Sequence, residues 1–429
     1  MISTVVLFVT FIIMMMLTVP IAFSMVLAVA ASLIFDGNLT SLSIIAQKMG
    51  NAPDSFTLLC VPLFLLAGNL MVHIGMAQRL AVFSMALVGH IRGGLAHSVV
   101  VANVIMAGMS GSATADAAAT GSIFIPMLKK ANYGAAYSAA VTATASVIGP
   151  IIPPSIIIVI YAGLANVSVG RLLLAGIVPG LLMGLALMAT IYIRALRRGY
   201  PVERRRSLKE LLHSAKDAVL ALLMPVVILA GLLGGIYTAT EGAAMAVVYA
   251  LFVGLVIYRT LNWQLFILSL KETVIANGVV MLIVCAATPF AWVLTAQGGA
   301  DFIRDLLAQN VNESWIVWSF SIALILILGC FMESVSILFI AVPILLPALN
   351  ALHADPVQVG IAFVLAAMIG AVTPPVGVSM FFACRIAEVT IMEFTKEFYG
   401  LLIGLFVVLA LVIVFPQITT AIPNLIFKP

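Results

Sequence analysis

The sequence predicts an all-α protein that crosses a membrane many times, and two observations carry that prediction. Of the 429 residues, 64% are hydrophobic and 8% are charged, whereas about a quarter of the residues of a soluble domain are charged. Apolar runs of about 20 residues, the length that one helical crossing needs, recur along the chain. These runs lack the polar–apolar alternation of membrane β-strands, which excludes a transmembrane barrel.

The apolar segments follow one another closely. In chain order they cover residues 3–16, 18–35, 56–74, 80–90, 97–128, 136–163, 172–193, 218–236, 240–258, 274–296, 314–350, 357–384 and 398–416. The segments at 97–128 and 314–350 are too long for one crossing and too short for two. Each has small or polar residues in its middle and a proline beyond them, so we expect two re-entrant hairpins. Non-helical backbone at membrane depth needs a covering of protein or a water-filled cavity.

The beginning of the chain admits two arrangements. In the first, residues 3–35 form one long helix broken at Pro20, and 80–90 is a short crossing. In the second, 3–16 and 18–35 cross separately, and 80–90 lies at the membrane surface.

Two amphipathic stretches, at 39–50 and 262–272, each precede a crossing in the first part of their half of the chain. Amphipathic helices of this kind lie in the plane of the membrane interface. We therefore expect two arm helices that brace a scaffold.

Basic residues predict the orientation of the chain. The segment 194–216 contains eight Lys and Arg residues and is expected on the cytoplasmic side. Tracing the crossings from it places both termini in the periplasm, opens the first hairpin to the cytoplasm and opens the second to the outside. In this arrangement 16 of the 20 Lys and Arg residues face the cytoplasm, as the positive-inside rule requires.

The chain divides into two halves, 1–193 and 218–429, joined by a basic linker at 194–217. Each half contains about five crossings and one hairpin, and because five is odd, the second half is inverted relative to the first. Matching motifs support this repeat: I-G-P-I-I-P-P at 148–154 resembles I-G-A-V-T-P-P at 369–375.

The two intramembrane carboxylates also fit the repeat. Asp116 and Glu333 lie ten residues before Pro126 and Pro343, respectively, so we expect them to be equivalent. Each is a candidate for a functional role, because ionisable groups inside a membrane are costly. The alternative is that each caps the start of a half-helix.

The paired breaks, at 136–163 and 357–384, predict a central ion and substrate site. Proline lacks an N–H, so a carbonyl one turn earlier loses its partner and becomes free to coordinate a cation. Helix N-termini at such breaks favour an anionic substrate. Two Na⁺ sites are therefore expected, with ligands drawn from Ser110, Ser112, Gly149 and Pro153 for the first and from Gly329, Glu333, Gly370, Thr373 and Gly377 for the second.

The substrate is expected between the two Na⁺ sites, near the hairpin tips. Candidate contacts are Ser110, Asp116, Ser334 and Arg385. Arg385 could grip a substrate carboxylate in a bidentate fork. It could equally extend to the cytoplasmic interface.

Several motifs resemble one transporter family. They are G-M-S-G-S-A-T-A-D-A-A-A at 108–119, G-P-I-I-P-P-S at 149–155, G-I-Y-T-A-T-E-G-A-A at 235–244 and G-A-V-T-P-P-V-G at 370–377. They resemble the large membrane subunit of tripartite ATP-independent periplasmic (TRAP) transporters, over essentially the whole chain. The resemblance implies a fold similar to divalent-anion/sodium symporters, with a scaffold and a transport domain that moves like an elevator. It also implies a separate small four-helix membrane subunit, a periplasmic substrate-binding protein, and sialic acid or a C4-dicarboxylate as the substrate class.

The expected function is Na⁺-coupled import of a small organic anion across the bacterial inner membrane, without enzymatic activity and without a nucleic-acid partner. A stand-alone sodium/anion symporter and a passive channel remain alternatives. An ATP-driven pump is excluded because no G-x-x-x-x-G-K-[ST] loop occurs. The G-M-S-G at 108–111 resembles a serine nucleophile turn, but the histidines lie at segment ends or in loops, where none can act as its base.

Overall fold

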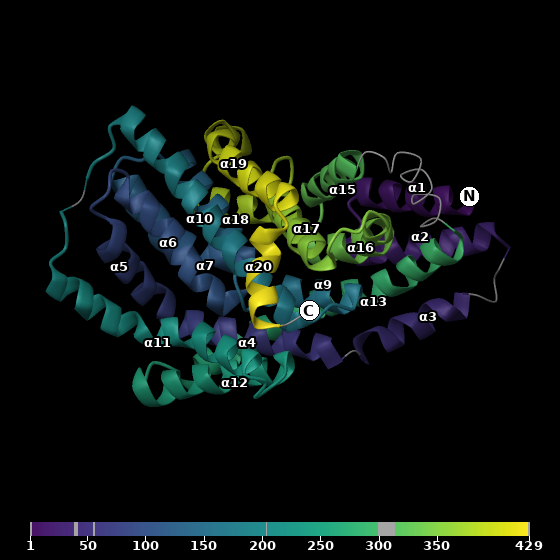
Figure 1. Ribbon diagram of the computed structural model, residues 1–429, viewed down its shortest axis with the longest axis horizontal. Coiled ribbons are helices and arrows are strands. Elements are labelled where there is room, and N and C mark those ends of the chain that lie inside the picture. Colours follow the sequence, from purple (N-terminus) through teal and green to yellow (C-terminus); the bar gives the residue numbers. More distant parts are fainter. Residues whose placement is uncertain (1, 38–41, 55, 203, 299–313, 428–429) are drawn as a thin grey trace.

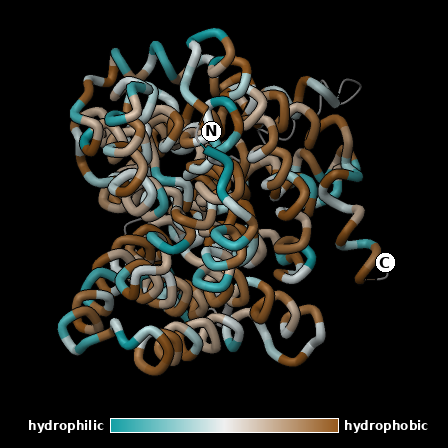
Figure 2. The backbone as a smooth tube through the Cα atoms, turned by 90° about the vertical axis from the view of Figure 1, so that its left-hand side faces the viewer, coloured by the Kyte–Doolittle hydropathy of each residue, from teal (hydrophilic) through white to brown (hydrophobic). Residues whose placement is uncertain are grey.

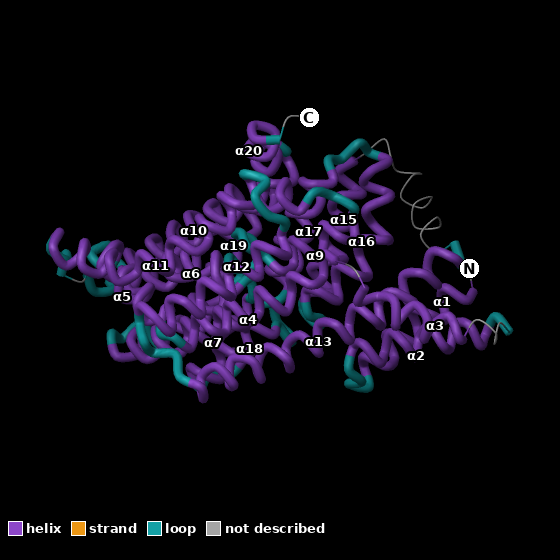
Figure 3. Tube along the Cα trace, turned by 90° about the horizontal axis from the view of Figure 1, so that it is seen from below, coloured by secondary structure: helices purple, strands orange, loops and turns teal. Residues whose placement is uncertain are grey.

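The computed structural model describes residues 2–37, 42–54, 56–202, 204–298 and 314–427, and in those residues every regular element is a helix (Figures 1 and 3). The first two helices, α1 (Ile2–Met16) and α2 (Ile21–Phe35), form an antiparallel pair. The Ser3 hydroxyl donates to the Asp36 carboxylate, and the Ser32 hydroxyl donates to the backbone oxygen of Ser3 over 3.0 Å. The contacts between these ends exclude one long helix broken at Pro20 and support two separate helices.

The next elements lead to a sharp bend. They are α3 (Leu42–Asn51), two short 3-10 turns (Ala52–Asp54 and Phe56–Leu59), α4 (Cys60–His73) and α5 (Met76–Val88). The axes of α4 and α5 differ by 68°. Gly75, at the bend, has a φ of 85°, which a residue without a Cβ adopts readily. Helix α5 packs against α6 and α11.

The first predicted hairpin is a pair of helices, α6 (Gly94–Ser110) and α7 (Ala113–Lys130). Gly111 ends α6 in a left-handed conformation with a φ of 58°, and the extended Ser112 begins α7. The Ser112 hydroxyl accepts a hydrogen bond from the Ala115 N–H over 3.4 Å, which caps the new helix. The chain therefore reverses over two residues, Gly111 and Ser112.

The first predicted break separates α8 (Ala135–Ser146) from α9 (Ile156–Ala165), and the longer α10 (Val169–Arg198) follows. Helix α8 is buried at every residue from Tyr137 to Ser146. A helix that is buried on all sides lies at the centre of a protein rather than against lipid.

The second half carries a comparable order of elements. They are α11 (Leu208–Leu233), α12 (Ala239–Phe252) with a π-helical turn (Val253–Ile257), α13 (Trp263–Ala296), α15 (Ser314–Gly329), α16 (Ser334–Ala351), α17 (Pro356–Gly370), α18 (Val378–Ala387), α19 (Ile391–Val414) and α20 (Gln417–Ile426). Helices α15 and α16 form the second hairpin, and α17 and α18 flank the second break. Helix α17 is buried at every residue from Val357 to Gly370, as α8 is at its centre.

Two boundaries differ from the sequence expectation. The stretch at 262–272 is not a separate arm helix, because α13 runs without interruption from Trp263 and the Asn262 side chain caps its start over 2.8 Å. The basic segment is also largely helical, because α10 continues to Arg198 and α11 begins at Leu208. Amphipathic and apolar stretches joined without a glycine or proline favour one continuous helix.

Matched features recur at a constant spacing in the two halves. Helix α7 begins at Ala113 and α16 begins at Ser334, 221 residues later, and the fourteenth residue of each helix is a proline, Pro126 and Pro347. Asn132 and His353, at the same spacing just beyond these helices, have φ values of 60° and 58°. These features support an internal duplication, while the opposite membrane orientation of the halves stays a prediction.

This register corrects the expected equivalence of the two carboxylates. Glu333 is the residue before α16 and therefore corresponds to Ser112, the residue before α7. Asp116 lies one turn further on, inside its helix. The error arose because α16 contains two prolines, Pro343 and Pro347, and the sequence match used the first of them.

Six of the described helices are long and apolar enough to cross a membrane, and the count is seven if α4 and α5 are one bent span. The six are α10, α11, α12 with its π-helical turn, α13, α16 and α19. Figure 2 shows hydrophobic residues along much of the helical tube. The expected broken crossings are present as pairs of short helices, each below the length of a full span.

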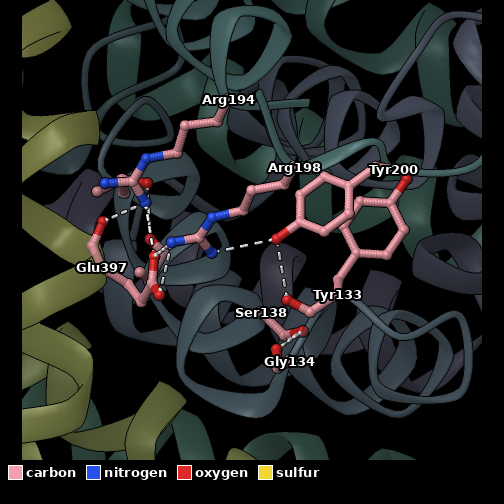
Figure 4. Close-up of polar contacts among 9 residues, drawn as sticks. Tyr133, Gly134, Ser138, Arg194, Arg198, Tyr200 and Glu397 are labelled. Atoms are coloured by element: carbon pink, nitrogen blue, oxygen red, sulfur yellow. Dashed lines mark hydrogen bonds and ion pairs between the residues drawn. The ribbon is translucent and has the colours of Figure 1, made fainter. Parts of the chain in front are cut away.

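An ion-pair cluster joins the C-terminal end of α10 to α19 (Figure 4). Arg194 and Arg198 both contact the Glu397 carboxylate, over 2.8 and 2.9 Å. Tyr200 stacks on Tyr133, with 4.2 Å between their ring centroids. The cluster therefore anchors α10 and α19 beside the first broken helix, because Tyr133 lies two residues before the start of α8.

Candidate functional site

The tips of both hairpins meet at one cavity of about 70 Å³. The first hairpin contributes the stretch 111–114 and the second contributes 333–335. Residues beside both helix breaks complete the polar and apolar lining, namely Ile156, Ile157, Ala371, Val378 and Ser379. Leu65 of α4, Val280 of α13 and Met368 of α17 also line it. The fold thus brings together the tips of the two expected hairpins and the residues beside the two expected helix breaks.

The polar side chains in the lining of this cavity are hydroxyl groups and one carboxylate. The Ser112 and Thr114 hydroxyls are hydrogen-bonded to each other over 3.1 Å, and Ser334 and Ser379 add two more hydroxyls. Within the described part of the chain, Glu333 is the only charged side chain that lines this cavity. Its Oε2 atom is buried without a hydrogen-bond partner. Although Glu333 occupies the N-cap position of α16, its side chain makes no capping bond, so capping does not account for it.

Asp116 lies behind the cavity rather than in its lining. Its side chain is fully buried, and its Oδ1 accepts a hydrogen bond from the Ser110 hydroxyl over 2.5 Å. Its Oδ2 has no hydrogen-bond partner and packs against the first helix break, where a Cβ added to Gly149 would lie 2.0 Å from it. Asp116 therefore connects the tip of the first hairpin to the first break.

The residues expected for the first Na⁺ site gather around the tip of the first hairpin. Ser110 and Ser112 line a second cavity, described below, and Gly149 contacts Asp116. The chain after Pro153 approaches the tip closely, since a Cβ on Gly111 would lie 3.2 Å from the Pro154 carbonyl oxygen. These groups are therefore neighbours in space.

The residues expected for the second Na⁺ site also converge. Gly329 and Gly370 pack backbone against backbone, because a Cβ on Gly329 would lie 2.7 Å from the Gly370 Cα. The Gly377 N–H donates to the Cys330 carbonyl over 3.2 Å, which ties the second break to the second hairpin. The Thr373 hydroxyl donates to the Ile369 carbonyl over 2.7 Å and keeps its lone pairs for another partner.

Arg385 is placed differently from its expected substrate contact. It lies in the last turn of α18, is exposed and lines neither cavity at the hairpin tips. Its position agrees with the alternative of a side chain that extends to an interface.

A second cavity, of about 240 Å³, adjoins the first and shares Leu65, Ser112 and Thr114 with it. It runs along the start of α7 and is faced by α4, α13 and α18 through Asn69, Glu272, Ala276 and Phe382, among others. The sequence reasoning did not single out Asn69, Glu272 or Ser379. Asn69 did carry a signal, because a polar residue within an apolar membrane segment is unusual.

Comparison with known proteins decides the family. The family model of the DctM component of tripartite ATP-independent periplasmic transporters matches residues 8–418. The chain belongs to this family. It is 40% identical to the sialic acid TRAP transporter large permease protein SiaM of Vibrio cholerae, over 95% of both chains. It is 38% identical to the C4-dicarboxylate TRAP transporter large permease protein DctM of Pseudomonas aeruginosa, over 89% of both chains.

A third relative is a longer permease than this chain. The isethionate TRAP transporter permease protein DctMQ of Oleidesulfovibrio alaskensis is 36% identical over 97% of this chain, which covers 65% of that relative. This chain is thus a TRAP large permease, a multi-pass protein of the bacterial inner membrane and a transporter rather than an enzyme. In agreement, the serine of the G-M-S-G segment, Ser110, bonds to Asp116 and not to a histidine.

Proposed function

We propose that this permease imports a small organic anion together with Na⁺, and that the cavity between the two hairpin tips is the substrate site. One observation carries the proposal. Residues 111–114 and 333–335, from hairpins in opposite halves of the chain, line the same cavity beside both helix breaks. Sites of this kind, at the interface of two repeats and next to discontinuous helices, are typical of secondary transporters.

Sodium coupling rests on the chemistry of the groups at the hairpin tips. Na⁺ is a hard cation and prefers oxygen ligands, as Ca²⁺ and Mg²⁺ do. Hydroxyl and backbone oxygens gather at both tips, around Ser110 and Ser112 in one half and around Gly370 and Thr373 in the other. We assign these two clusters to two Na⁺ ions, with Glu333 and Asp116 as the carboxylates that offset their charge.

The substrate class follows from the relatives. The curated relatives named above carry sialic acid, C4-dicarboxylates and isethionate in their names, at identities between 36% and 40%. All three are organic acids, so we propose an organic anion of the sialic acid or C4-dicarboxylate class. The hydroxyls of Ser334 and Ser112 are in place to donate to such an anion.

Movement of a transport unit against a scaffold would expose the site to each side in turn. We assign both hairpins and both broken helices to the moving unit, and α4 and α13 to the scaffold. A hydrogen bond from the Asn69 amide to the Thr273 hydroxyl, over 2.9 Å, holds α4 to α13. Gly68 of α4 approaches the first hairpin closely, since a Cβ there would lie 3.2 Å from the Met109 carbonyl oxygen. At Gly68 no side chain stands between α4 and the hairpin backbone, and a contact of this kind suits a sliding movement.

Two partners complete the proposed system. The family description names a tripartite transporter, and we propose a small four-helix membrane subunit and a periplasmic substrate-binding protein as the other parts. Uptake by proteoliposomes containing this chain, the small subunit and the binding protein tests the proposal. Two Na⁺ with a monoanion predict a Hill coefficient above one and stimulation by an inside-negative potential, because each net charge gains about 2.3 kcal/mol per 100 mV.

The same assay separates the alternatives. Full uptake in Na⁺-free buffer would contradict sodium coupling. Robust uptake by the chain alone would identify a stand-alone symporter, and uptake that never exceeds equilibrium would identify a channel.

A further inference from the structure

The lining of the second cavity includes a carboxylate, that of Glu272, which has no role in the proposed transport cycle. We propose that Glu272 lines a cation-selective release path, through which Na⁺ leaves the first hairpin toward the side of the basic segment. The inference rests on the proposed sodium coupling and adds a route and a residue to it.

The geometry of the second cavity connects the two ends of this path. Its lining includes Ser110, which is buried, and Ser112, and both belong to the proposed first Na⁺ site. It also includes Thr114, whose hydroxyl is hydrogen-bonded to that of Ser112. Glu272, on α13, is also part of its lining, and the side chain of Glu272 is 47% exposed. A cavity of about 240 Å³ with an exposed side chain in its wall can admit a hydrated ion.

Contacts identify the side to which Glu272 belongs. Glu272 receives a contact from His73 at the end of α4, and the next residue but one, Gly75, leads into the α4–α5 bend. The Thr260 hydroxyl donates to the Ile74 carbonyl over 3.1 Å, and the Tyr258 hydroxyl donates to the Asp217 carbonyl over 3.0 Å. Asp217 lies near the start of α11, shortly after the basic segment. Glu272 is therefore on the side expected to face the cytoplasm.

The charge of the lining favours a cation. Among the residues that the structure describes, Glu272 is the only charged one that lines this cavity. An anionic substrate is repelled by a carboxylate in such a confined space, whereas Na⁺ is attracted and concentrated there. The Glu272 carboxylate would thus favour the exit of Na⁺ along this cavity and oppose the exit of the anionic substrate, although the two enter together.

His73 lies against the Glu272 carboxylate and weakens the attraction of this carboxylate for Na⁺. Its Nε2 is 2.8 Å from the Glu272 Oε2, and its side chain is 19% exposed. A histidine that donates to the carboxylate occupies one of the lone pairs that Na⁺ would use. Removing His73 should therefore strengthen the interaction of Na⁺ with Glu272, and removing the carboxylate should weaken it.

Inhibition of uptake by Na⁺ inside the vesicle tests the path. The preparation contains the full chain, the small subunit and the binding protein, and sialic acid or succinate is the probe, whichever the wild type takes up. Because the binding protein is added only outside, the assay reports only transporters whose periplasmic face is outward. Glu272→Gln should raise the internal Na⁺ concentration for half-inhibition by about threefold or more, in line with the concentrating effect of one charge in a cleft. His73→Gln should lower it.

Asp217→Asn provides the matched control. Asp217 is also an acid near the same end of the molecule, its side chain is also 47% exposed, and it also lies beside a histidine, His213, at 3.7 Å. It does not line the release cavity. The control should leave internal Na⁺ inhibition unchanged, and none of the three variants should alter the external Na⁺ dependence.

The outcomes are distinct. Equal effects of Glu272→Gln and Asp217→Asn, or no effect of Glu272→Gln, would overturn the release path while external Na⁺ dependence stands. Wild-type uptake that does not depend on external Na⁺ would instead overturn the proposed function itself.

Discussion

A methyl group added to Gly329 should separate the second hairpin from the second helix break. The new Cβ would lie 2.7 Å from the Gly370 Cα and 3.3 Å from the Ala367 carbonyl oxygen. Both are backbone atoms, so no side-chain rotation relieves the overlap. Reaching an ordinary contact of 3.4 Å requires a movement of about 0.7 Å at Gly370.

The cost of this movement can be bounded. Overpacking a well-packed core costs about 1–3 kcal/mol. Separation also weakens the hydrogen bond from the Gly377 N–H to the Cys330 carbonyl, which measures 3.2 Å, and a bond of this kind contributes about 1 kcal/mol. Gly329→Ala should therefore lower the free energy of unfolding by about 2–4 kcal/mol. It should also raise the Na⁺ needed for half-maximal uptake, because Gly370 and Thr373 move away from the hairpin tip.

Thermal unfolding of the purified membrane complex and Na⁺-dependent uptake together measure both effects. Gly278→Ala is the matched control, because nothing lies within 4 Å of a Cβ at that position in α13. Gly278→Ala should leave the free energy of unfolding unchanged or raise it slightly, because alanine has a higher helix propensity than glycine. If Gly329→Ala unfolds like Gly278→Ala and keeps the wild-type Na⁺ dependence, the close backbone contact does not define a Na⁺ site.

Three further predictions test other parts of the molecule. Ser112→Ala and Thr373→Ala should each raise the Na⁺ concentration for half-maximal uptake without changing substrate binding to the soluble partner, and unchanged Na⁺ dependence in both would place the ions elsewhere. Val202 is exposed in the basic segment, so a cysteine placed there in a cysteine-free background by Val202→Cys should react with an impermeant thiol reagent only from the cytoplasmic side. Labelling from outside would refute the inverted topology. Hydrogen bonds from Ser207 lower the pKa of Glu210 below its ordinary 4.5. The stabilisation that these bonds give the first turn of α11 is therefore present above that pH and is lost as the pH falls through the lowered pKa. Hydrogen exchange in that turn should accelerate in acid for the wild type and should be fast at both pH values for Glu210→Ala, which removes the accepting oxygen, and a pH-independent wild type would contradict the capping role.

The sequence predicted the hairpins and the helix breaks because their causes are local. The Gly111–Ser112 reversal needs one glycine in a left-handed conformation and one capping hydroxyl, and both can be seen in the sequence. The Pro-Pro pairs at 153 and 374 remove backbone donors wherever the chain goes. Helix ends in the basic segment were less predictable, because α10 and α11 extend beyond their apolar parts.

Long-range packing accounts for what sequence reasoning missed. Glu272 and Asn69 line a cavity but lie on helices far from the recognised motifs, and Ser379 lies just after the motif at 370–377, which gave no sign that its hydroxyl lines a cavity. Their roles depend on which helices α4, α13 and α18 pack against. No local pattern encodes that choice, since almost every face of these helices is apolar.

The sequence by itself determined that this chain is a multi-pass membrane transporter of the TRAP family with two broken helices and two hairpins. The scarcity of charged residues indicates a membrane environment, and each Pro-Pro pair removes two adjacent backbone donors and so interrupts a helix, whereas single prolines such as Pro126 lie inside helices. Only the tertiary structure decided that Glu333 faces the cavity while Asp116 is turned toward Gly149. Glu333 stands just before its helix, whereas Asp116 lies four residues later than the equivalent position, so the exact start of each helix sets where the carboxylate points.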